Sequence, residues 1–76
     1  MPDQFEYKII KTYGVISSTK TGWTKELNLI SWNGKEPRID IRDWSPEHEK
    51  MGKGITLSTS EAKNLNDLLN NSDIEW

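Results

Sequence analysis

The sequence has 76 residues, a net charge of −2 and no cysteine, which leaves room for one domain and excludes disulfide bonds and thiolate metal sites. The first residues show neither a basic start nor an apolar run, and no apolar stretch approaches the ~20 residues that span a bilayer. We therefore expect a cytoplasmic protein without a signal peptide or a membrane partner. A chain this short buries little apolar surface by itself, so self-association is also expected.

The pattern in chain order predicts four strands and one helix. Residues 5–17 are rich in β-branched and aromatic side chains and predict a long first strand. Its apolar residues occupy both odd and even positions, so the sequence does not show which face of this strand is buried. The adjacent Ile9 and Ile10 indicate a bulge or burial on both sides. A turn leads to a second strand at 23–32, and Asn33-Gly34 then favours a tight turn because both residues tolerate positive φ. Strands at 38–44 and 54–57 follow.

The period changes after the fourth strand. Ser58 and Glu61 form a capping box for a helix over 59–70, and residues 71–76 are a tail. Apolar residues at helical spacing give this helix one stripe, made of Ala62, Leu65, Leu68 and Leu69. Residues 1–76 therefore read as a single α+β domain, a four-stranded antiparallel sheet followed by one C-terminal helix.

Alternation divides the sheet residues between two faces. One face is aliphatic, and we expect it to form the core with the helix stripe; it carries Leu27, Leu29, Ile39, Ile41, Ile55 and Leu57. The opposite face is expected to be exposed and carries Asn28, Ile30, Trp32, Arg38, Asp40, Arg42 and Trp44.

Two tryptophans with arginines between them are unusual on a solvated face. Aromatic rings stack on unpaired bases and arginine neutralises phosphates, so the pattern favours single-stranded nucleic acid over a duplex. Alternatively, Trp32 and Trp44 pair across strands or fill a dimer core, with arginines lying over them as cation–π partners. Residues 8–42 carry seven basic and three acidic residues, a local balance that can steer an anionic ligand although the net charge is negative.

Catalytic chemistry is not indicated. His48, the only histidine, lies in a charged loop where we expect it to be solvated. Gly52-Lys53-Gly54 lacks the spacing of a phosphate-binding P-loop, although a glycine–lysine corner could meet one phosphate. We expect no enzyme activity, cofactor, metal site or small-molecule substrate.

Several short motifs follow one another between Leu27 and Leu69. They are Trp32-Asn33-Gly34-Lys35, then Ile39-Asp40-Ile41-Arg42 followed by Asp43-Trp44, then Gly52-Lys53-Gly54-Ile55-Thr56-Leu57, and finally the capped helix. In this order they resemble the positive-cofactor-four family of transcriptional coactivators, which bind single-stranded DNA, and within it the bacterial branch typified by YdbC.

The resemblance implies a homodimer formed largely through the helices, at Leu65, Leu68 and Leu69, with two curved sheets that make grooves for single strands. It places the family's sheet aromatics on Trp32 and Trp44, its strand arginine on Arg42, and its lysines on Lys35, Lys50 and Lys53.

We therefore predict a homodimer that binds single-stranded DNA with little sequence preference and acts in transcription, replication or repair. The predicted contact residues are Trp23, Lys25, Asn28, Trp32, Lys35, Arg38, Arg42, Trp44, Lys50 and Lys53. RNA as the ligand, and a dimeric protein-interaction module that uses the aromatic face, are the alternatives.

Overall fold

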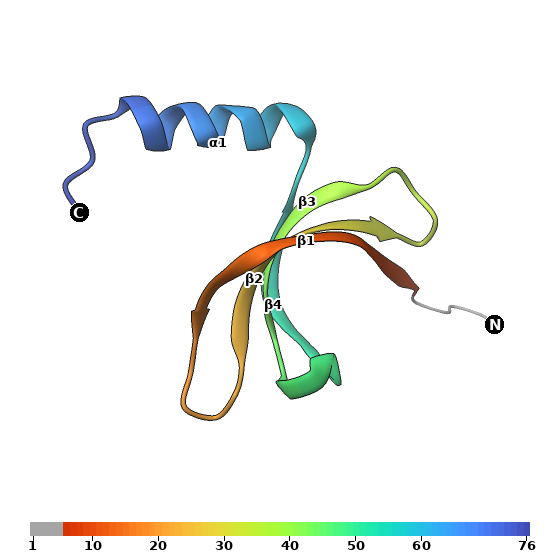
Figure 1. The fold of residues 1–76 in the computed structure, drawn as a ribbon. Coiled ribbons are helices and arrows are strands. Elements are labelled where there is room, and N and C mark those ends of the chain that lie inside the picture. The colour runs from red at the N-terminus through yellow and green to blue at the C-terminus, as the bar shows by residue number, and fades with distance from the viewer. Residues whose placement is uncertain (1–5) are drawn as a thin grey trace.

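The computed structural model describes residues 6–76, which form one antiparallel sheet and one helix (Figure 1). The strands lie in sequence order and are β1 (Tyr7–Ser18), β2 (Thr24–Trp32), β3 (Arg38–Trp44) and β4 (Met51–Leu57). A short 3₁₀ helix, η1 (Pro46–His48), lies between β3 and β4, and α1 (Thr59–Asn71) follows β4. The predicted α+β architecture is confirmed, although β4 begins at Met51 rather than at residue 54. Residue 5, where the first strand was predicted to begin, lies outside the described residues.

Strand β1 is irregular because it carries more residues than it pairs. Its twelve residues face nine consecutive residues of β2. The register shifts between Ile9 and Lys11, between Thr12 and Gly14, and between Val15 and Ser17. Each extra residue bends the strand and increases its twist. Of the two alternatives for Ile9-Ile10, a bulge or burial on both sides, the structure has the bulge. The two further register shifts explain why apolar residues fall on both odd and even positions of the strand.

The turns and caps form as the local sequence predicts. Asn33 and Gly34 take φ values of 51° and 75°, and the Lys35 amide donates to the Trp32 carbonyl at 2.9 Å to close the turn. At the start of α1 the Glu61 amide donates to the Ser58 hydroxyl at 3.2 Å, and the Ser58 amide donates to the Glu61 carboxylate at 2.8 Å. Both ends of the capping box are therefore made.

The burial of the two sheet faces corrects the prediction. The completely buried side chains are not those of the aliphatic face but those of the opposite one: Ile30, Trp44, Asn28 and Asp40, all at 0 % exposure. The aliphatic face is at best half-buried, Ile55 is 54 % exposed, and α1 has no buried residue. The physical reason is curvature: the sheet is strongly bent, and α1 runs away from the strands after Ser58 (Figure 1). The completely buried side chains lie on the face opposite the one that lines the groove with α1.

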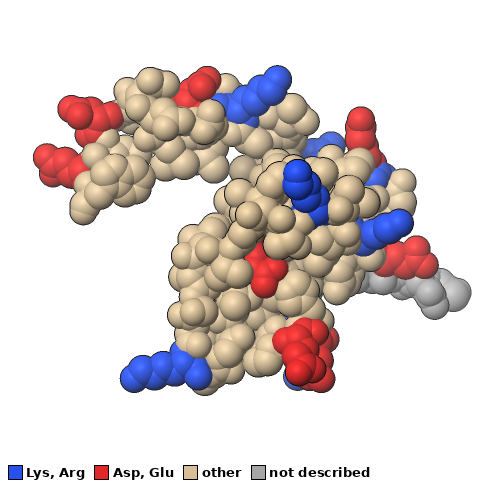
Figure 2. Space-filling model, viewed as in Figure 1, with Lys and Arg blue, Asp and Glu red and all other residues tan. Residues whose placement is uncertain are grey.

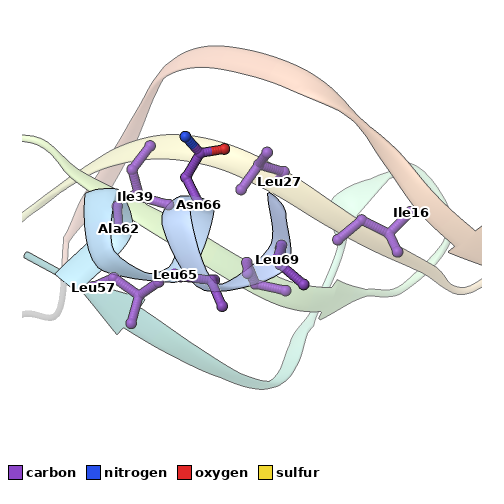
Figure 3. A pocket seen from close by; sticks show the side chains of 9 residues that line it. Ile16, Leu27, Ile39, Leu57, Ala62, Leu65, Asn66 and Leu69 are labelled. Carbon is purple, nitrogen blue, oxygen red and sulfur yellow. The ribbon is translucent and has the colours of Figure 1, made fainter. Parts of the chain in front are cut away.

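An apolar groove therefore remains open between α1 and the aliphatic face (Figure 3). It has a volume of about 350 Å³ and is lined by Ile16, Leu27, Ile39, Ile41, Leu57, Ala62, Leu65, Asn66 and Leu69. Within residues 6–76, α1 included, no helix is long and apolar enough to cross a membrane.

Candidate nucleic-acid interface

The face toward which the sheet bends, here called the concave face, carries Glu26, Asn28, Ile30 and Trp32 on β2 and Arg38, Asp40, Arg42 and Trp44 on β3. Arg42 of β3 pairs with Glu26 of β2. Glu26 lies six residues before Trp32 in β2. In a flat sheet six residues span about 20 Å, yet the guanidinium carbon of Arg42 lies 5.1 Å from the centre of the Trp32 ring. The curvature of the sheet thus brings its two ends together over one surface.

A buried ion pair fixes the middle of the concave face. The Asp40 carboxylate accepts from Arg42 Nε at 3.0 Å and Nη2 at 3.1 Å, and from the Thr56 hydroxyl at 2.8 Å. Arg42 Nη1 donates to the Gly52 carbonyl at 3.1 Å. The guanidinium is therefore held from two sides beside the Trp32 ring. Such a cation–π contact restricts the orientation of the indole.

An aromatic cluster fills the rest of the concave face. The Tyr7 ring lies 5.9 Å from the Trp32 ring and 5.6 Å from the Trp44 ring, tilted by 42° and 44°. Trp32 keeps partial exposure, whereas Trp44 has none. The arrangement of an arginine over a tryptophan, which the sequence left open as an alternative to base contact, is present at Trp32.

Glu26 and His48 form a second polar cluster beside Trp44. The Glu26 carboxylate accepts from the Thr24 hydroxyl at 2.7 Å and from Asn28 Nδ2 at 3.2 Å, and it lies 3.0 Å from His48 Nε2. Burial raises the pKa of Glu26, but the hydrogen bonds from Thr24, His48 and Asn28 outweigh it and hold this pKa below its ordinary value. The His48 ring stacks on Trp44, with centroids 4.5 Å apart and planes 12° apart.

The prediction that His48 is solvated holds only in part: its side chain is 36 % exposed, but its ring stacks on Trp44 and lies beside Glu26. The loop sequence Ser45-Pro46-Glu47-His48-Glu49-Lys50 does not indicate a stacking contact. His48 meets Trp44 only because the loop folds back on the end of β3. Tyr7 and Glu26 were also absent from the predicted site. The alternation within β2 could have found Glu26, which shares the parity of Asn28 and Trp32.

The predicted contact residues fall into three groups. Asn28, Trp32, Arg42 and Trp44 lie together on the concave face, but Asn28 and Trp44 are completely buried. Lys35 and Arg38 are exposed at the β2–β3 end of the sheet, and Lys50 and Lys53 are exposed near the β3–β4 loop. Figure 2 shows basic side chains at the end of the sheet near the β2–β3 turn and at the β1–β2 turn, and acidic ones at η1 and at the C-terminal end of α1.

The remaining pair, Trp23 and Lys25, lies on the opposite face of the sheet. Lys25 Nζ is 2.7 Å from the Asp43 carboxylate, and a Cβ at Gly52 would approach the Trp23 ring to 3.1 Å. Both residues line a pocket of about 380 Å³ with Ser17, Thr19, Thr21, Thr24 and Asp43. The structure therefore separates them from the concave face.

The described part of the chain gathers no group of three or more histidine, cysteine, aspartate or glutamate side chains that could hold a metal ion. The predicted dimer residues lie on α1: Leu65 and Leu69 line the apolar groove, and Leu68 is 60 % exposed.

Comparison with known proteins gives two matches. An uncharacterized protein of Treponema pallidum (strain Nichols) is 45 % identical over 73 residues, which cover 96 % of this chain and 86 % of that protein. Residues 19–68, from the β1–β2 turn to the third turn of α1, match the family described as Transcriptional Coactivator p15 (PC4). The match covers the concave face of β2 and β3, both exposed pairs of basic residues and most of the helix. The chain therefore belongs to the transcriptional coactivator p15 (PC4) family.

Proposed function

We propose that this protein binds single-stranded DNA with little sequence preference, across the concave face, as a homodimer. Membership of the coactivator family supports nucleic-acid binding and a coactivator-like role. The observation that carries the proposal is the partly exposed Trp32 ring, held by an Arg42 guanidinium that Asp40 and the Gly52 carbonyl fix in place. An indole fixed in this way loses little freedom when a base stacks on it.

The proposal assigns different roles to the residues of the concave face and its edges. Trp32 stacks on a base, which contributes about 1–3 kcal/mol and tolerates any sequence. Lys35 and Arg38 contact phosphates at one end of the sheet, and Lys50 and Lys53 do so at the other. Arg42 positions Trp32 and has N–H donors left for one phosphate. The contacts of the four exposed basic residues alone correspond to a slope of about −3 in log affinity against log salt.

Salt-dependent binding of an end-labelled dT oligonucleotide of about twenty nucleotides, measured by fluorescence anisotropy, tests these roles. Lys35→Ala and Lys53→Ala should each make the slope shallower by about 0.7, and Trp32→Ala should weaken binding by about fivefold to a hundredfold. Lys63→Ala is the matched control, because Lys63 is exposed on α1 and should leave the slope unchanged. Equal slopes for all lysine variants would contradict the proposal.

The apolar groove supports the homodimer. It is open along α1 and the aliphatic face, and its lining residue Leu69 is 46 % exposed. Ile55 on the sheet and Leu68 on α1, which do not line the groove, are 54 % and 60 % exposed. A second copy of α1 and its sheet offers a surface of the same apolar chemistry, as a two-fold interface requires. Burying this surface would supply the core that a single chain of this length lacks.

Sedimentation equilibrium at micromolar concentrations tests the dimer. We expect the wild-type protein to sediment as a dimer and Leu65→Asp to sediment as a monomer, because a carboxylate in the groove would lose its hydration in a dimer. Asn64→Asp adds the same charge to an exposed position of α1 and should remain dimeric. A wild-type monomer at tens of micromolar would contradict this part of the proposal.

A further inference from the structure

The loop between β3 and β4 is closed at its base. The Ser45 amide donates to the Lys50 carbonyl at 3.0 Å, and the Lys50 amide donates to the Ser45 hydroxyl at 2.6 Å. Ser45 is buried, whereas Pro46 and Glu47 are exposed. Residues 46–49 therefore form a small unit attached to the sheet through this pair of hydrogen bonds.

The backbone of this unit holds two consecutive residues in an unfavourable conformation. Glu47 and His48 have φ values of 58° and 59°, the left-handed region that side chains with a Cβ rarely occupy. Strained backbone persists only where surrounding contacts hold it, and it is common in segments that switch between two arrangements. The contacts that hold it here are the hydrogen bond from the His48 amide to the Ser45 carbonyl at 2.9 Å and the contacts of the His48 side chain with Trp44 and Glu26.

The position of the His48 ring is one that a nucleobase could take. The two ring planes are almost parallel, 12° apart with centroids 4.5 Å apart, the offset-stacked geometry that flat aromatic groups favour. Trp44 is completely buried, whereas His48 is partly exposed, so the histidine is the outer ring of the stack. If His48 moves away, one face of the Trp44 indole becomes available.

We propose that residues 45–50, the η1 lid, cover a base-stacking face of Trp44 with His48, and that a single-stranded nucleic acid displaces His48 from it. This inference rests on the proposed function and extends it: the free protein is partly self-blocked at the second tryptophan. Glu47 and Glu49 are exposed in the same loop, and Figure 2 shows acidic side chains at η1.

The cluster beneath the lid is not fully satisfied in its closed arrangement. Trp44 Nε1 and Asn28 Oδ1 are buried and have no hydrogen-bond partner among residues 6–76. Buried polar groups without partners are costly, so their presence favours an alternative arrangement that satisfies them. Opening the lid gives water or the edge of a base access to this region.

His48 is the only histidine in the chain, so its imidazole protons report on the lid without ambiguity in NMR spectra of the untagged full-length protein. In the free protein, the ring current of Trp44 should shift these protons upfield. On titration with the dT oligonucleotide at pH 7.5 and low salt, they should move toward the positions of an unstacked histidine, in step with the anisotropy of the labelled oligonucleotide. Anisotropy that reports binding while the His48 protons keep their upfield positions would overturn the lid and leave the proposed function intact. Absence of any complex would refute both.

A substitution tests the same inference by affinity. His48→Ala removes the stack and the contact with Glu26, and it should bind the oligonucleotide about twofold to tenfold more tightly, the range that an aromatic contact is worth. Glu49→Gln is the control, because it removes a charge from the same loop without touching the stack. Equal affinities of His48→Ala and wild type, or an equal gain for Glu49→Gln, would overturn the role of the stack. Circular dichroism checks that both variants are folded.

Discussion

Asp40→Asn perturbs the organisation of the concave face at its centre. The Asp40 side chain is completely buried, and the Arg42 side chain is only 15 % exposed. Asparagine keeps the shape of aspartate but removes the charge, and it turns one acceptor oxygen toward Arg42 or Thr56 into an N–H donor. The guanidinium of Arg42 then remains buried without its counter-charge.

Two estimates of the resulting loss overlap. Asp40 accepts two hydrogen bonds from Arg42 and one from Thr56, and because a hydrogen bond to a charged group contributes about 1.5–3 kcal/mol, the loss of one or two of them costs about 1.5–6 kcal/mol. Removing one partner of a buried ion pair costs about 3–5 kcal/mol. We expect Asp40→Asn to lower the free energy of unfolding by about 3–5 kcal/mol, a large part of the 5–15 kcal/mol that is typical of a folded domain.

Urea denaturation followed by circular dichroism and tryptophan fluorescence measures this loss, at one fixed protein concentration because the stability of an oligomer depends on it. Asp43→Asn is the control: Asp43 pairs with Lys25 at 2.7 Å, but both side chains are about two-fifths exposed, so the expected loss is below about 1 kcal/mol. A loss for Asp40→Asn that equals the loss for Asp43→Asn would refute the assignment of the buried pair as the organiser of this face.

Three further perturbations have expected outcomes. Gly54→Ala should lower the free energy of unfolding by at least about 1–3 kcal/mol, because the new Cβ would lie 2.5 Å from the Ile41 carbonyl oxygen. Gly14→Ala is the control and should leave this free energy unchanged, because a Cβ at Gly14 meets no atom within 4 Å. Urea denaturation compares the two variants. Ser58→Ala should lose about 0.5–2 kcal/mol of unfolding free energy by removing the helix cap, and a loss of zero would contradict that role. Because folding lowers the pKa of Glu26, the stabilisation that this carboxylate contributes is complete above about pH 4.3 and is lost as the pH falls through its folded pKa. Acid unfolding monitored by fluorescence should therefore be less steep in Glu26→Gln than in the wild type. Identical profiles would contradict this role of Glu26.

Those parts of the fold that depend on local chemistry were predictable from the sequence. The Asn33-Gly34 turn and the Ser58–Glu61 capping box need only neighbouring residues, and both form as expected. Strand β3 has the predicted bounds because its alternation is uninterrupted. The early start of β4 at Met51 was missed because two residues, Gly52 and Lys53, lie opposite one residue of β3 in an irregular part of the ladder.

The choice of the buried face was not predictable from the same pattern. Alternation assigns residues to two faces but does not say toward which face the sheet bends. The bend comes from the extra residues in β1. In the sequence these residues only interrupt the alternation of apolar and polar positions, so the pattern does not show the direction of the bend. For the same reason Trp44 was expected to be exposed and is buried: its cover, Tyr7 and His48, comes from a bulged edge strand and from a loop.

Competition binding measures whether the protein prefers single strands to duplex DNA. The labelled dT oligonucleotide, bound to the wild-type protein at low salt, is challenged with unlabelled single-stranded DNA, RNA of matched sequence, and duplex DNA of equal nucleotide concentration. Our account predicts that single strands displace the label and that duplex fails to do so at concentrations at least about tenfold higher, because paired bases offer no free ring face for Trp32. Displacement by duplex as efficient as that by single-stranded DNA, or no complex with the dT oligonucleotide at all, would contradict it.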